Sequence, residues 1–120
     1  MAFLNPNHRG LAYGDGYMQG AGSCGQIVAL VGNDLFAVNI DPTVKSFGML
    51  IKDYKAGEMP GIFCMGGVYE TDVFEGTINA GDDLKVSENG KLIAGVQAGE
   101  EIVARAISIS SGTLKFRLLI

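Results

Sequence analysis

The chain has 120 residues, a formal net charge of −4 at pH 7, and a hydrophobic content of 48%. This length suits one domain, and the apolar content argues against disorder of the whole chain. The acidic balance and the lack of any block of Lys or Arg argue against nucleic acid as a partner, because binding phosphates requires a basic face.

Charged residues make up 18% of the chain, below the usual quarter for a soluble domain. We therefore expect another chain, including further copies of this one, to bury part of the surface. The N-terminus lacks a basic segment followed by an apolar run, and no stretch is long enough to span a bilayer. These features predict synthesis in the cytoplasm and no membrane partner.

Residues 1–25 are rich in glycine and contain Pro6, so they show neither a helical nor a strand period. We interpret this segment as an extended N-terminal arm. It nevertheless carries apolar side chains that need a surface to pack on, namely Phe3, Leu4, Leu11, Tyr13, Tyr17 and Met18. In one alternative the arm wraps over its own domain, and in the other it becomes ordered on a neighbouring subunit.

Residues 26–120 form the predicted body, in which short β-branched segments alternate with turn residues. The expected strands are 26–31, 35–40, 47–52, 62–65, 68–74, 84–86, 102–110 and 114–120. Strands and turns at this spacing are typical of an all-β fold, either a small barrel or a sandwich.

Glycine-containing turns separate these strands. Gly66-Gly67 is expected to close one strand, and Asn89-Gly90 is expected to form a type I′ hairpin turn. In the last strand Leu114, Phe116, Leu118 and Ile120 share one face. This alternation predicts a half-buried strand at the edge of a barrel or sandwich.

The residues that usually carry catalysis or bind metals are sparse. His8 is the one histidine and lies in the arm, so neither a catalytic triad nor a zinc site is expected. Gly20, Gly22 and Gly25 match a dinucleotide-binding pattern, but a predicted strand follows them where that motif requires a helix. We therefore expect no enzyme activity, no cofactor and no metal. Cys24 and Cys64 are interpreted as reduced thiols, with a disulfide as the alternative.

Carboxylates crowd one stretch of the body. They are Glu70, Asp72, Glu75, Asp82, Asp83 and Glu88. An acid pair or a calcium site is one reading. A solvated face that discourages wrong strand pairing is the favoured one.

Several segments resemble the capsid decoration, or cement, proteins of tailed bacteriophages. The similar segments are 67–71, 74–77, 80–86 and 89–92, the C-terminal 103–106 and 115–119, and the earlier 48–51 and 55–58. The resemblance covers about residues 45–120 and rests on turn and strand patterns.

The resemblance implies a small β-barrel or β-tulip body on the outer surface of an icosahedral head. Such a protein binds the major capsid protein, acts as a trimer or in another small group, bridges coat subunits, and is neither an enzyme nor cofactor-dependent. The arm residues listed above would then contact the coat protein. A β-barrel module of a head or tail fibre that binds glycans or a receptor is the alternative, and a small hydrolase using the acidic stretch is a third.

Overall fold

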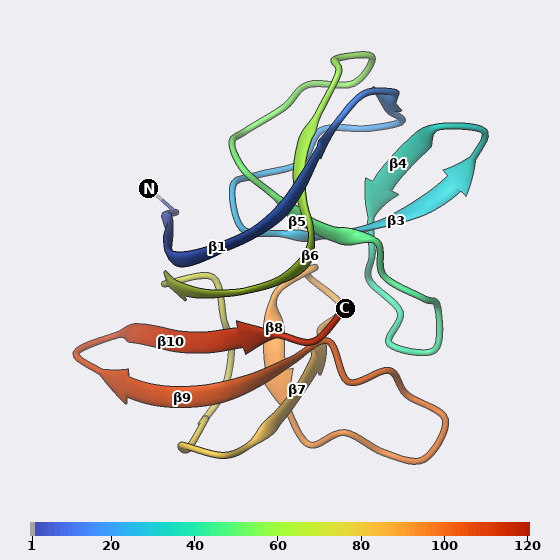
Figure 1. Cartoon of the computed structure of the whole chain (residues 1–120). Coiled ribbons are helices and arrows are strands. Elements are labelled where there is room, and N and C mark those ends of the chain that lie inside the picture. The colour runs from blue at the N-terminus through green and yellow to red at the C-terminus, as the bar shows by residue number, and fades with distance from the viewer. Residues whose placement is uncertain (1) are drawn as a thin grey trace.

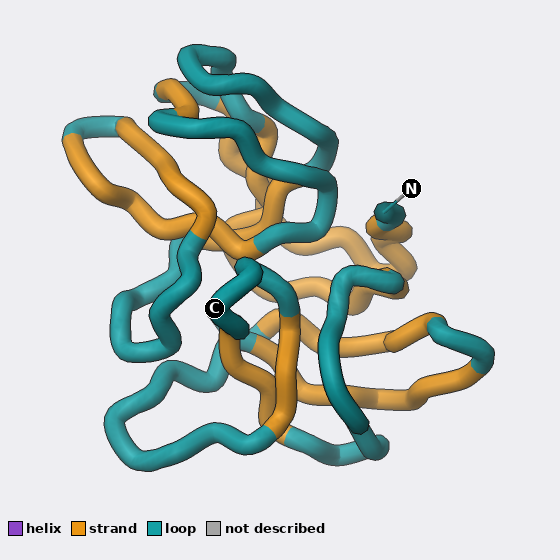
Figure 2. Tube along the Cα trace, turned by 180° about the vertical axis from the view of Figure 1, so that it is seen from behind, coloured by secondary structure: helices purple, strands orange, loops and turns teal. Residues whose placement is uncertain are grey.

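A computed structural model describes residues 2–120, and every regular element in this range is a β-strand. The strands are β1 (Leu4–Gly14), β2 (Tyr17–Met18), β3 (Ile27–Gly32), β4 (Leu35–Val38), β5 (Gly48–Leu50), β6 (Gly61–Thr71), β7 (Asp83–Val86), β8 (Leu92–Ala94), β9 (Ala104–Ser110) and β10 (Thr113–Leu118). Figure 2 shows these strands joined by loops. The all-β prediction is confirmed. No helix able to cross a membrane occurs among the described residues.

The strands form one ten-stranded sheet in the order β2-β4-β3-β5-β6-β10-β9-β7-β8, with β1 added beside β6 (Figure 1). The sheet does not close into a barrel, so the predicted barrel is not observed. β10 lies between β6 and β9, which corrects the expectation of an edge strand at the C-terminus. Its alternation is as predicted, because Leu114, Phe116 and Leu118 are buried.

β6 organises the sheet, because it is long and changes its partner midway. One of its edges pairs with β1 along its length. The other edge pairs first with β5, through Ile62 and Phe63, and then with β10, through residues 68–71. Gly66 and Gly67, with φ of 61° and 101°, lie between these two parts. We predicted that these glycines end a strand, but here their positive φ values let one strand bend and continue.

The interior is divided into two apolar clusters by the central strands β3, β5 and β6. Met49 and Phe63 belong to the larger cluster, whereas Leu50 and Ile62, their neighbours in the chain, belong to the smaller one. Successive side chains of a strand point to opposite faces, so these strands are buried on both sides. This explains their continuous apolar runs.

The turn at Asn89-Gly90 is present but is not of the expected type. Gly90 has a φ of 73°, whereas Asn89 is not among the residues with positive φ, as a type I′ turn would require. In the β9–β10 hairpin both central residues, Ser111 and Gly112, have a positive φ, of 51° and 75°. Cys24 and Cys64 are both free thiols, as interpreted from the sequence.

Candidate attachment surface

Residues 4–14, the main part of the predicted arm, lie on the chain's own sheet as β1. Leu4 pairs with Thr71 at one end and Gly14 with Gly61 at the other. The structure of this single chain therefore shows the first alternative, an arm that packs on its own domain. A contact between this segment and a neighbouring subunit stays a prediction.

The N-terminal end of β1 is anchored by polar contacts to the end of β6. The Phe3 N–H donates to Asp72 Oδ1 at 2.9 Å, and the Thr71 hydroxyl donates to the Phe3 carbonyl at 2.7 Å. Leu4 packs against the larger apolar cluster. Phe3 and Leu4 therefore hold the chain's own fold together.

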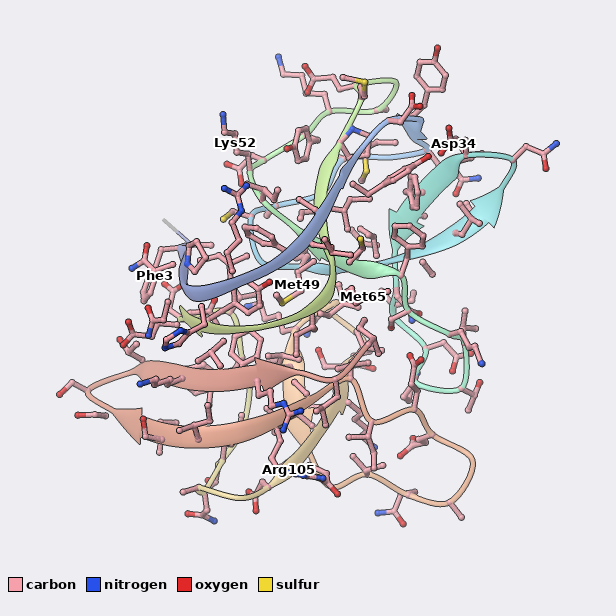
Figure 3. The ribbon with its side chains drawn as sticks, viewed as in Figure 1. Phe3, Asp34, Met49, Lys52, Met65 and Arg105 are labelled. Carbon is pink, nitrogen blue, oxygen red and sulfur yellow. The ribbon has the colours of Figure 1, made fainter. Side chains whose placement is uncertain are left out.

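The other end of β1 is anchored by Tyr13 and leads into the buried Met18. The Tyr13 hydroxyl donates to Asp34 Oδ1 at 2.7 Å, and this hydrogen bond is the main cause of a raised pKa for the tyrosine. Its ring meets Phe47 edge-on, with centroids 5.5 Å apart. Met18 is only 2% exposed. Figure 3 shows Phe3 and Asp34 at opposite ends of β1.

Two of the six predicted contact residues present their side chains to solvent. Leu11 is 60% exposed and Tyr17 is 62% exposed. Leu11 lies directly across from Met65 of β6, which is 59% exposed. These side chains provide apolar area that a partner can cover. Large exposed apolar residues are also found elsewhere on the molecule, so exposure by itself does not single out this face.

The free edge of β1 is the second feature of this surface. Among the described residues β1 pairs only with β6, so its opposite edge has no strand partner. Pro6 lacks an N–H group, and a register shift separates Pro6 from His8. A second register shift separates Leu11 from Ala12, so residues 8–11 and 12–14 are the two short stretches of this edge that can accept an added strand through main-chain hydrogen bonds.

Strand β1 contains one Arg or Lys side chain, Arg9, and no acidic residue. The Arg9 guanidinium lies 5.4 Å from the centroid of the buried Phe63 ring, in a cation–π arrangement. Arg9 therefore covers the apolar ring with its guanidinium. We did not single out Met65 or Arg9 from the sequence, because their positions depend on the pairing of β1 with β6.

The acidic stretch makes local contacts. Asp83 accepts from the Arg105 side chain at 3.0 Å, and Asp82 accepts from the Asn79 N–H at 2.8 Å. Glu75 accepts from the Ser87 hydroxyl at 2.7 Å, which is the main reason why its pKa is lowered. Within residues 2–120 no group of three or more His, Cys, Asp or Glu side chains is arranged to hold a metal ion.

No protein-family profile and no curated protein sequence matches this chain. The fold is similar to the solved structure of the head fibre gp8.5 N base of bacteriophage phi29, with a TM-score of 0.65 and 12% sequence identity. The similarity covers 90% of this chain and 92% of that chain. At this identity the likeness establishes a common fold.

Proposed function

We propose that this chain is a structural virion protein that binds the outer surface of a tailed-phage head and stabilises the shell by bridging major coat subunits. The observation that carries the proposal is the similarity to a head-fibre base, which covers 90% of this chain and 92% of the neighbour. The sequence resemblance to cement proteins points independently to the head surface. Synthesis in the host cytoplasm and assembly beside further copies of itself belong to the same proposal.

The surface around β1 is the contact that we propose for the coat protein. Leu11, Met65 and Tyr17 are each about three-fifths exposed, so a partner that covers them removes apolar area from water. The free edge at residues 8–11 and 12–14 adds main-chain hydrogen bonds to an incoming strand. Repeated modest contacts of this kind on one shell act together through effective concentration.

The base of a head fibre is the second candidate function, and the same structural neighbour favours it. In that case the chain would fix a longer fibre to the head. The two functions differ in stoichiometry, because a cement protein covers the shell whereas fibres occupy selected positions.

Quantitative mass spectrometry of gradient-purified, DNA-filled particles tests these functions. A copy number close to that of the major coat protein supports cement, and a smaller number that depends on particle symmetry supports a fibre base. If the protein stays outside the particle fractions, the proposal of a virion protein fails.

Binding of purified protein to heads that lack it tests the contact surface. We expect the double variant Leu11→Ser, Tyr17→Ser to bind at least about tenfold more weakly, from the apolar area that it removes. The matched control is Ile107→Ser, Ile109→Ser, because these β9 residues are 42% and 39% exposed on a different part of the sheet. Equal binding by the two double variants would exclude the β1 surface.

A further inference from the structure

A second surface of the molecule combines an open hollow with two carboxylates that form no ion pair among the described residues. The loop after β4 and strands β7 and β8 enclose a cavity of about 290 Å³. Its lining includes the apolar side chains of Ile40, Pro42, Val86 and Ile93 and the carboxylates of Glu75 and Glu88. We call this hollow the acidic groove. In Figure 1 strands β7 and β8, which carry part of this lining, lie in the lower part of the molecule, whereas the C-terminal end of β1 lies at the top.

An ordered loop presents Ile40 and Pro42, one part of the apolar lining of the acidic groove. Ile40 is 60% exposed, although Asn39 beside it is only 4% exposed. The Asn39 Nδ2 donates to the Val44 carbonyl and to the Ser46 hydroxyl, both at 3.0 Å, and the Asp41 N–H donates to Asn39 Oδ1 at 3.0 Å. The buried amide thus holds the loop in place. A preformed apolar contact loses little conformational entropy when it is covered.

The carboxylates at the acidic groove are only partly balanced by basic residues of the chain. Lys85 is the basic residue in the lining, and its Nζ is paired with Glu100 Oε1 at 2.8 Å. Glu75 and Glu88 form no ion pair with a basic side chain among the described residues. Lys91 lines a different hollow, but its positive charge also contributes to the lowered pKa of Glu75. The acidic groove is therefore electrostatically complementary to a basic ligand.

The Glu75 carboxylate is also fixed in position. Its Oε1 accepts from the Ser87 hydroxyl at 2.7 Å and from Asn89 Nδ2 at 3.0 Å. Both donors belong to the turn between β7 and β8, so the carboxylate is tied to the same frame as Val86 and Ile93. Glu75 Oε2 remains for a cationic ligand.

We propose that the acidic groove binds an extended basic segment of a partner protein, with an aliphatic side chain packed on Ile40 and flanking Lys or Arg side chains paired with Glu75 and Glu88. The apolar lining favours the aliphatic anchor, and the Glu75 and Glu88 carboxylates select the basic flanks. The inference does not depend on attachment to a phage head, because it uses a different face and its test contains no heads.

Selection from a random dodecapeptide display library on the immobilised 120-residue chain tests the proposal. We expect the enriched peptides to carry Lys or Arg on both sides of an aliphatic residue. A synthetic peptide of the most enriched sequence should bind less tightly as the salt concentration rises, because the charges at the groove are partly exposed. A set that lacks this pattern, or no enriched set at all, overturns the proposal.

Matched variants locate the binding of that peptide, measured by fluorescence anisotropy. Ile40→Ser should weaken it about tenfold or more, whereas Leu11→Ser should leave it unchanged, since Leu11 is equally exposed at 60% on another face. The double variant Glu75→Gln, Glu88→Gln should flatten the salt dependence. Asp15→Asn is the charge control, because Asp15 Oδ1 accepts from the Gly16 N–H and an amide oxygen preserves this bond.

Equal binding by the Ile40→Ser and Leu11→Ser variants would overturn the proposal. Sedimentation equilibrium of the chain alone tests for a second copy as the occupant. Self-association abolished by Ile40→Ser would mean that a second copy fills the groove, and it would overturn the assignment to a basic segment of another protein. A chain whose association state is unchanged by Ile40→Ser agrees with the proposal.

Discussion

A single methyl group added at Gly10 tests whether β1 is held on β6 as the structure shows. A Cβ at this position would overlap the carbonyl oxygens of Met65 and Gly66, which belong to the paired strand. These are main-chain atoms, so no side-chain rotation relieves the overlap. Gly10→Ala is therefore expected to force β1 away from β6.

The expected loss of stability follows from the hydrogen bonds between β1 and β6. A displacement of about 1 Å lengthens donor–acceptor distances of about 2.9 Å beyond those of a hydrogen bond. If two or three bonds are lost at about 1 kcal/mol each, the free energy of unfolding falls by about 2–3 kcal/mol. If β1 detaches from β6 completely, the free energy of unfolding falls no further, because the added methyl group then no longer overlaps the carbonyl oxygens of β6.

Gly14→Ala is the matched control on the same strand. Nothing lies within 4 Å of a Cβ built at Gly14, and Gly14 is not among the glycines with positive φ. This substitution is expected to be neutral or to stabilise by about 0.5 kcal/mol, because it reduces the freedom of the unfolded chain. Both variants contain the same added methyl group. The difference between their free energies of unfolding therefore measures the cost of the overlap at position 10.

Urea unfolding followed by circular dichroism gives the two free energies, and hydrogen exchange reports on β1 itself. We expect a lower midpoint for Gly10→Ala and faster exchange of the amides in residues 4–14. Equal midpoints and equal exchange in the two variants would refute the pairing of β1 with β6 in the isolated chain. They would instead favour an arm that becomes ordered on a neighbouring subunit.

Two further predictions concern the core and the acidic stretch. Phe116 is fully buried and its ring lies 5.7 Å from that of Tyr69, so Phe116→Ala should lower the free energy of unfolding by about 3–5 kcal/mol. Arg117→Ala at the exposed neighbouring position should change it by less than about 0.5 kcal/mol in the same urea experiment. The hydrogen bond from Ser87 lowers the pKa of Glu75, so the folded state binds fewer protons than the unfolded state. The resulting stability is present above the ordinary value of 4.5 and is lost as the pH falls through the lowered value. Glu75→Gln should therefore lose less stability than the parent protein on acidification, and an equal loss would contradict this role.

Local pattern predicted many of the strands, because burial on one or both faces leaves a direct trace in the residue sequence. Leu114, Phe116 and Leu118 alternate with Lys115 and Arg117, and the strand found there buries the apolar set. The apolar run at Ile27 and Val28 likewise marks a strand, here buried on both faces. In both cases the signal comes from residues that are neighbours in the chain.

Turn chemistry was predicted less well, because the sign of φ depends on the strands that a turn must join. Asn89-Gly90 is a common hairpin signal, yet here only the glycine has a positive φ. Gly66-Gly67 predicted the end of a strand, but both neighbouring segments find partners and β6 continues through the bend. Pairing with distant strands decided both outcomes.

The sequence by itself determined that the chain is all-β, acidic and poor in catalytic residues, since these properties follow from composition and short-range periodicity. Only the tertiary structure decided which arm residues are exposed: Met18 is buried, whereas Leu11 and Tyr17 face solvent. It also brought the Ile40 loop beside Glu75 and Glu88 to form the acidic groove. The physical reason is that burial and charge proximity arise from contacts between segments far apart in the chain, which no local pattern records.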